Sequence, residues 1–174
     1  MSDDSEEPDV PLPPGYAPLE AKERVARLLS IIWYGNDQGF ALPVAKRISV
    51  TDVTIEEKKD APGKTETTLV CELDVQKDMV NAYDSLHGGA SAYLVDVCSS
   101  LALAAAGKLN SVSQALNVVY HAPAPLGSHL RIMNWTITVG SRVMSTRTEI
   151  WDATGGRLVA TGIHIKMEPS AAKL

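Results

Sequence analysis

Apolar and polar residues follow a helical spacing in one early part of the chain and strand-like patterns elsewhere. Residues 19–34 carry apolar side chains every three or four positions, which is typical of an amphipathic helix packed on a larger body. This stripe consists of Val25, Leu28, Leu29, Ile32 and Trp33. Residues 46–58 and 65–75 are rich in β-branched residues and are separated by the turn sequence DAPGK, so they predict a β-hairpin.

The stretch from residue 85 to residue 106 predicts a second helix. It contains no proline, its glycines lie at its front, and it is rich in alanine and leucine, which favour helices. Apolar residues occur almost all around this helix, which is typical of a helix in the middle of a core. They include Tyr93, Leu94, Val97, Cys98, Leu101, Ala102 and Ala105.

Four further segments alternate between apolar and polar residues and predict strands at 111–120, 129–139, 142–151 and 157–167. Their connections are short and rich in turn residues, so these strands should be antiparallel neighbours. The connection between the second and third strands is long enough to hold the buried helix. We therefore expect an α+β fold, with an antiparallel sheet of five to six strands wrapped around a long central helix and an N-terminal amphipathic helix.

The composition predicts one globular domain with two tails. The chain has 174 residues, of which 45% are hydrophobic and 21% are charged, and this suits a single core. Residues 1–17 combine acidic residues, serine and proline, a composition that cannot build a core. We therefore expect a mobile tail at 1–17, a domain at 18–168 and a flexible tail at 169–174.

Charge and apolar patterning argue against several partners. The net charge is -5 without a run of lysine or arginine, which argues against nucleic acid. No apolar run approaches the roughly 20 residues of a membrane span, and the acidic N-terminus differs from a leader peptide, so we expect no membrane insertion and an intracellular location. Cys71 and Cys98 lie in apolar segments without metal-ligand spacing, so we expect buried free thiols and no metal site.

The sequence HGG at residues 87–89 stands at the start of the predicted central helix. A helix N-terminus presents unpaired backbone N–H groups and the positive end of the helix dipole, and glycine lets another group approach the backbone closely. This arrangement suits the stabilisation of an oxyanion that develops during acyl transfer. The alternative is that Gly88 and Gly89 only allow tight packing of the helix on the sheet.

Asp96 places a carboxylate among apolar residues of the same helix. Such a group is costly to bury unless it is paired or used in chemistry, although it could also lie on an exposed edge or cap another element. Gly88 and Asp96 are eight positions apart, about 12 Å along the helix axis, so one chain cannot bring both to the same carbonyl carbon. Two chains with antiparallel helices could do so, which predicts a homodimer with two equivalent composite sites.

The order of these residues resembles that of a known family. Asn81, the sequence LHGG at 86–89, LVD at 94–96 and the strand VSQALNVVYHAPAPLG are similar to hotdog-fold acyl-CoA thioesterases of the phenylacetate-degradation type, including the animal thioesterase-superfamily enzymes. The resemblance covers about residues 20–167. It implies a hotdog fold, hydrolysis of an acyl-CoA to free acid and CoA, and assembly as a dimer or a dimer of dimers. CoA enters as part of the substrate, and no other cofactor is implied.

The resemblance also implies roles for five residues. The backbone N–H of Gly88 would be the main oxyanion donor, while Asn81 and His87 would order the loop and the thioester. Asp96 of the partner subunit would act as general base or nucleophile, and Ser113 would help to position the water. Alternatives stay open for three of them: Asn81 can form a turn, His87 can cap the helix or be a buried hydrogen-bonded residue, and Ser113 can be an ordinary strand residue.

Substrate binding is expected at further positions. Gly89 adjoins the expected oxyanion site. Lys108, Arg142 and Lys166 are candidate cations for the phosphates of CoA, although each could be an ordinary solvated charge. Asp84 departs from the family, which commonly has glycine or a small residue there, and it could change the loop shape or add negative charge near an anionic substrate.

The C-terminal Ala-Lys-Leu at 172–174 resembles a peroxisomal address, so we expect a peroxisomal or cytoplasmic location, with the import receptor as a partner in the first case. Two rival functions remain. A non-catalytic acyl-CoA sensor would not need Asp96. An enoyl-thioester hydratase on the same fold would use a histidine and an acid in another arrangement, which HGG followed by Asp96 fits poorly.

Overall fold

The computed structural model describes residues 10–169. The first nine residues of the predicted N-terminal tail and the Ala-Lys-Leu at 172–174 lie outside this range, so the peroxisomal address stays a prediction.

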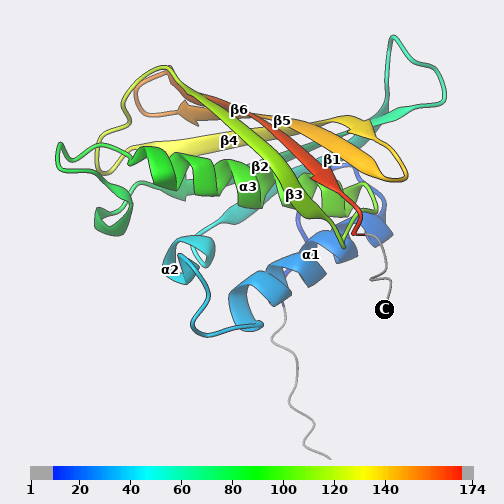
Figure 1. Ribbon diagram of the computed structural model, residues 1–174, viewed down its shortest axis with the longest axis horizontal. Coiled ribbons are helices and arrows are strands. Elements are labelled where there is room, and N and C mark those ends of the chain that lie inside the picture. Colours follow the sequence, from blue (N-terminus) through cyan, green and yellow to red (C-terminus); the bar gives the residue numbers. More distant parts are fainter. Residues whose placement is uncertain (1–9, 170–174) are drawn as a thin grey trace, which may run out of the picture.

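A six-stranded antiparallel sheet with one long helix against its inner face forms the body of the protein (Figure 1). The strand order is β1-β2-β4-β5-β6-β3, and every neighbouring pair is antiparallel. The predicted α+β fold with a central and an N-terminal helix is therefore confirmed. The elements are α1 (Leu19–Tyr34), α2 (Leu42–Ala45), β1 (Ser49–Glu57), β2 (Thr65–Asp74), a short 3-10 helix (Lys77–Met79), α3 (Gly88–Ala105), β3 (Val112–Tyr120), β4 (His129–Val139), β5 (Val143–Asp152) and β6 (Arg157–Met167).

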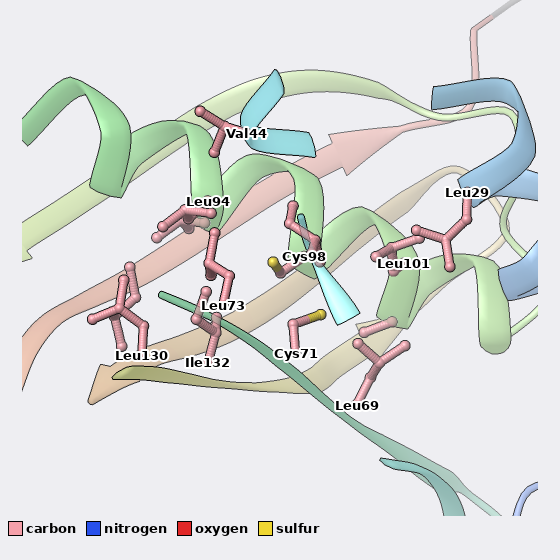
Figure 2. Packing of buried hydrophobic residues seen from close by; sticks show 14 of the residues in the cluster. Leu29, Val44, Leu69, Cys71, Leu73, Leu94, Cys98, Leu101, Leu130 and Ile132 are labelled. Carbon is pink, nitrogen blue, oxygen red and sulfur yellow. The ribbon is translucent and has the colours of Figure 1, made fainter. Parts of the chain in front are cut away.

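The central helix α3 is buried because the sheet wraps around one side of it and α1 covers another (Figure 1). Among residues 10–169, it is the one helix long and apolar enough to cross a membrane, with a mean hydropathy of 1.3. Its apolar side chains pack against the sheet, so core formation accounts for this composition. The two cysteines, Cys71 of β2 and Cys98 of α3, are free and fully buried in this core, as predicted (Figure 2).

The N-terminal helix α1 is fastened to the end of α3 by one side chain. The guanidinium of Arg24 donates to the carbonyl oxygens of Ala104 and Ala105 at 3.0 and 2.8 Å. The last carbonyls of a helix have no partners inside the helix, and a cation there also complements the helix dipole. Arg24 therefore stabilises the C-terminal end of α3 while Val25 and Leu29 pack in the core.

Residues 10–17 are packed against the sheet, which corrects the prediction of a mobile tail over this part. The N–H of Val53 donates to the carbonyl of Pro14, and the N–H of Ala17 donates to the carbonyl of Val53. Gly15 has a φ of +112°, and a side chain there would collide with the backbone of Val53. Val10 and Ala17 are buried as well. The segment thus covers the outer edge of β1, which the polar composition of the tail did not indicate.

Gly162 of β6 sets how closely the sheet approaches α3. A Cβ atom at this position would lie 2.5 Å from Cγ1 of Val95, a stiff β-branched side chain. We expect Gly162→Ala to lower the free energy of unfolding by about 1–3 kcal/mol, because extra volume strains a packed core. Urea denaturation measures this. Adding Val95→Ala should remove most of the penalty, and an unchanged stability in the single variant would contradict the packing argument.

Candidate active site

The N-terminus of α3 presents two backbone N–H groups, those of Gly88 and Ala90, that have no acceptor within residues 10–169. His87 is the N-cap in an extended conformation, and its Nδ1 accepts a hydrogen bond from the N–H of Gly89 at 2.9 Å. The capping role that the sequence left open for His87 is thus what its side chain performs. The hydroxyl of Tyr120 donates to the carbonyl of Gly88 at 3.0 Å, so the end of β3 lies beside the Gly88 N–H.

The loop before α3 is shaped by Asn81. Its side-chain oxygen accepts hydrogen bonds from the N–H groups of Tyr83 at 2.9 Å and Ser85 at 3.3 Å, so Asn81 does form a turn. Its amide nitrogen donates to no atom of residues 10–169 and remains available to a ligand. Asp84 adopts a φ of 50°, a conformation that glycine takes freely and aspartate tolerates. Asp84 therefore adopts the left-handed backbone conformation that a glycine at this position would adopt easily.

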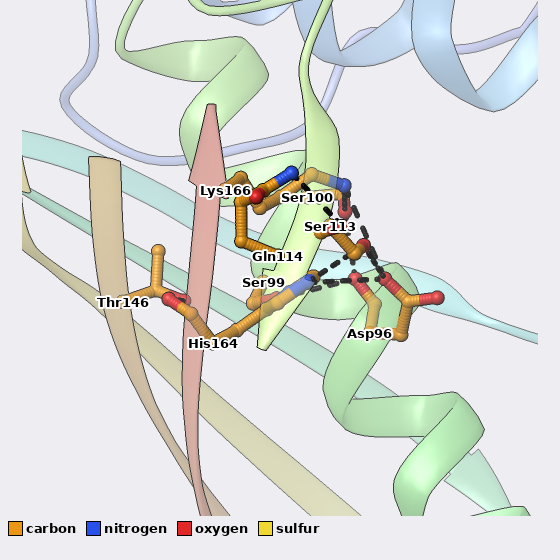
Figure 3. Close-up of polar contacts among 8 residues, drawn as sticks. All are labelled: Asp96, Ser99, Ser100, Ser113, Gln114, Thr146, His164 and Lys166. Carbon is orange, nitrogen blue, oxygen red and sulfur yellow. Dashed lines mark hydrogen bonds and ion pairs between the residues drawn. The ribbon is translucent and has the colours of Figure 1, made fainter. Parts of the chain in front are cut away.

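Asp96 lies at the centre of a polar cluster on the exposed side of α3 (Figure 3). Its side chain is 46% exposed, and its Oδ1 lies 3.5 Å from the hydroxyl of Ser113. The Nε2 atom of His164 is 2.9 Å from the same hydroxyl and 3.6 Å from Asp96 Oδ1. The structure thus brings two of the candidate residues, Asp96 and Ser113, together and adds His164 from β6.

Lys166 lies beside Asp96 instead of on the surface. Its Nζ is 2.8 Å from the hydroxyl of Ser100 and 4.0 Å from Asp96 Oδ1, and only 9% of its side chain is exposed. Burial lowers the pKa of Lys166, an effect that the negative charge of Asp96 opposes. This place does not suit the contact with CoA phosphates that the sequence suggested, and it makes Lys166 an electrostatic neighbour of the carboxylate.

His164 is fully buried and neutral at neutral pH. Burial, and next the charge of Lys166, lower its pKa from 6.5 to about 4, while Asp96 acts in the opposite direction. Its Nδ1 lies 2.8 Å from the hydroxyl of Ser99. The nearby carboxylate favours the tautomer with the proton on Nε2, in which His164 donates to Ser113. In this tautomer Nδ1 is an acceptor for the hydroxyl of Ser99, which also lies 3.1 Å from the carbonyl oxygen of Asp96. The hydroxyl proton of Ser113 is then directed to Asp96.

Sequence reasoning missed His164 and Ser99. Ser99 stands three residues after Asp96 on the helix, and His164 shares strand parity with the buried Gly162, so both positions carried a weak signal. His164 reaches Ser99 and Asp96 because β6 packs against α3. Ser99 and His164 are 65 positions apart in the sequence, so this contact is not visible in the local pattern.

The remaining candidate cations lie at the other end of α3. Lys108 Nζ is 3.4 Å from the carbonyl of Ser141 and 3.5 Å from Glu168, while Arg142 is exposed and forms no ion pair within residues 10–169. The turn between β4 and β5 thus brings Lys108 and Arg142 to one corner of the sheet. Across the described part of the chain, no group of three or more metal-ligating side chains occurs.

Comparisons with known proteins identify the family of this chain. Acyl-coenzyme A thioesterase 13 of Homo sapiens is 35% identical over 107 residues, which cover 61% of this chain and 74% of that protein. The chain belongs to the thioesterase superfamily. The family model described as thioesterase superfamily matches residues 83–159, from the loop before α3 into β6. The prediction of a hotdog-fold thioesterase is confirmed.

Solved structures of other thioesterases share the fold. Zebra fish thioesterase superfamily member 2 superposes with a TM-score of 0.66 and 25% identity, covering 83% of this chain and 98% of that one. Thioesterase superfamily member 2 of Mus musculus has a TM-score of 0.55 and 31% identity, covering 59% and 81%. The zebra fish match reaches over most of this thioesterase, well beyond the residues that the family model covers.

The low pKa of His164 makes the stability of the thioesterase depend on pH. In the unfolded chain this histidine binds a proton near pH 6.5, whereas in the folded chain it does so only near pH 4. Above about pH 6.5 the ring is neutral in both states, so the free energy of unfolding is at its full value. As the pH falls from 6.5 toward 4, the unfolded chain binds a proton that the folded chain does not bind, and the free energy of unfolding decreases. We expect the free energy of unfolding to fall more steeply in this window than in His164→Gln, by up to about 1.4 kcal/mol per pH unit.

Urea denaturation at a series of pH values measures the two slopes, and the protonation of the ring can be followed by NMR. Lys166→Met should raise the pKa of His164, because it removes a neighbouring positive charge. Equal slopes in the parent protein and His164→Gln would show that His164 is not held neutral.

Proposed function

We propose that this thioesterase hydrolyses acyl-CoA at a composite site formed by two copies of the chain. The observation that carries the proposal is the free N–H of Gly88 at the positive end of α3, on the same helix as the half-exposed carboxylate of Asp96. The human relative named acyl-coenzyme A thioesterase 13 supports acyl-CoA as the substrate class. Ser113 and His164 lie beside Asp96, and this arrangement favours a hydrolase over a non-catalytic sensor, which would need no carboxylate at this position.

In the proposed reaction, the N–H of Gly88 and the amide of Asn81 donate to the thioester carbonyl oxygen. Asp96 of the partner subunit takes a proton from a water held by Ser113, and the water oxygen bonds to the carbonyl carbon. The negative charge that develops on the carbonyl oxygen is stabilised at the helix N-terminus. Collapse of this intermediate breaks the C–S bond, and the CoA thiolate takes the proton from Asp96 and leaves as the thiol. A thiolate is a good leaving group, so no nucleophilic serine or cysteine is needed.

One chain cannot perform this reaction because Gly88 and Asp96 are about 12 Å apart along α3. The edge strand β3 offers the surface for a second copy. It pairs only with β6 within residues 10–169, and its other edge is uncovered, unlike that of β1. Its exposed apolar side chains are those of Val112, Leu116, Val119 and Tyr120.

The contacts of β3 also support the order of groups in such a dimer. Ser113, near the start of β3, lies at Asp96, whereas Tyr120, at its end, lies at Gly88. If β3 pairs antiparallel with β3 of a second copy, the start of one strand faces the end of the other. Asp96 of the partner subunit then comes beside Gly88. Further assembly into a dimer of dimers stays a prediction.

Lys108 and Arg142 complete the proposal as ligands of the CoA phosphates. They lie at the corner where β3 begins and β6 ends, on the side of the chain that supplies Asp96. Arg142 is free to form bidentate contacts with a phosphate.

The role of the Gly88 N–H as oxyanion donor can be tested with a residue that lacks a backbone N–H. Gly88 is the first residue of α3, where proline is well tolerated, and the extended conformation of His87 suits a residue before proline. We expect Gly88→Pro, which lacks the N–H, to lower kcat for acyl-CoA hydrolysis by about 10²–10³-fold. Gly88→Ala keeps the N–H and is the matched control. Equal loss in both variants would refute the role of the N–H, and full activity in Asp96→Asn would refute the general base.

Mixing two inactive variants tests the composite site. Random pairing of Gly88→Pro with Asp96→Asn makes half of the dimers mixed, and each mixed dimer has one intact site, so about one quarter of the parent activity should return. Thiol release after joint denaturation and refolding measures it, and light scattering confirms the dimers. The double variant mixed with either single variant is the control without recovery. If no activity returns from mixed dimers, both groups belong to one chain.

A further inference from the structure

A pocket of about 370 Å³ lies between the segment before β1 and the first turns of α3. Its lining includes His87 and Gly89, the two neighbours of the proposed oxyanion donor. The rest of its wall is mainly apolar. The apolar side chains that matter here are Phe40, Val44, Met79, Ala90 and Tyr93.

Phe40 is held over this pocket although it is 85% exposed. Its ring packs edge-on against Tyr93, with the ring centres 5.6 Å apart. The next residue, Ala41, has a φ of 51°, an unfavourable conformation for alanine that persists only where the surroundings enforce it. The indole N–H of Trp33 donates to the carbonyl of Ala45 at 2.9 Å and fastens the segment to α1. These contacts indicate that the ring of Phe40, although exposed, has a defined position in the lining of the pocket.

We propose that this pocket receives the acyl chain of the thioester and that Phe40 sets the accepted chain length. The inference rests on the proposed function. A carbonyl held at Gly88 starts its acyl chain beside His87 and Gly89, which belong to the lining of the pocket. The one charged residue of the lining, Asp78, is paired with Arg47 at 2.7 Å, so the pocket offers no free cation and does not suit the CoA phosphates.

The position of the aromatic pair in the lining indicates the substrate class. Phe40 and Tyr93 contact each other within the lining of this pocket of about 370 Å³. Tyr93 lies four positions beyond Gly89 on α3, about 6 Å along the helix axis. The contact between Phe40 and Tyr93 is therefore about one helical turn away from Gly89. We expect medium-length apolar acyl chains to end beside this pair, whereas a palmitoyl chain must extend past it.

The test is a series of straight-chain acyl-CoA substrates from acetyl to palmitoyl. The parent protein should prefer octanoyl or decanoyl over palmitoyl. Phe40→Ala should raise the ratio of kcat/KM for palmitoyl to that for octanoyl roughly tenfold, and Phe40→Trp should lower it. Phe40 is exposed, so these variants are expected to fold. Tyr16→Ala removes an exposed aromatic ring outside the pocket and should leave the profile unchanged.

Binding of the thioethers S-octyl-CoA and S-hexadecyl-CoA, which cannot be hydrolysed, provides a second measurement. The affinity ratio should shift in the same direction in Phe40→Ala. An unchanged length profile and an unchanged affinity ratio in both Phe40 variants would overturn the assignment of the pocket. Shifted thioether binding without hydrolysis of any acyl-CoA would support the pocket and overturn the proposed reaction.

Discussion

Burial of α3 is the constraint on which the rest of the structure depends. An 18-residue helix with apolar side chains on nearly every side must be enclosed, and the sheet together with α1 encloses it. The helix then fixes the positions of the groups that it carries. Its N-terminus supplies a free N–H and a positive dipole end, and Asp96 follows at a distance that a rigid helix cannot shorten. The separation of Gly88 and Asp96, on which the proposed composite site depends, is therefore fixed by a helix that core packing holds in place.

The two edges of the sheet are treated differently. Residues 14–17 cover β1, while β3 keeps an open edge with exposed apolar side chains. An open edge strand invites pairing with another strand. Since β3 touches Gly88 at one end and Asp96 at the other, the same strand that could recruit a second copy also connects the two halves of the proposed site.

Patterns along the sequence predicted the local elements well, because the period of the apolar residues reflects which side of an element is buried. The central helix and the four later strands follow from this, and the resemblance singled out Asp96 and Ser113 as candidate site residues. What escaped prediction depends on contacts between distant segments. Val10 and Ala17 pack in the core although they belong to a proline-rich segment, and Lys166 is buried because its strand passes under α3. The neutral state of His164 depends on such packing as well.

The placement of the two cysteines affects how the enzyme can be assayed. Cys71 and Cys98 are fully enclosed in the interior, and burial raises the pKa of the Cys71 thiol well above its usual value. A thiolate is the form that reacts with chromogenic reagents, so the native protein contributes little background when liberated CoA is titrated with such a reagent. Colour that appears without added substrate would instead report molecules that have opened, and the same reagent can therefore monitor the integrity of the preparation during a kinetic run.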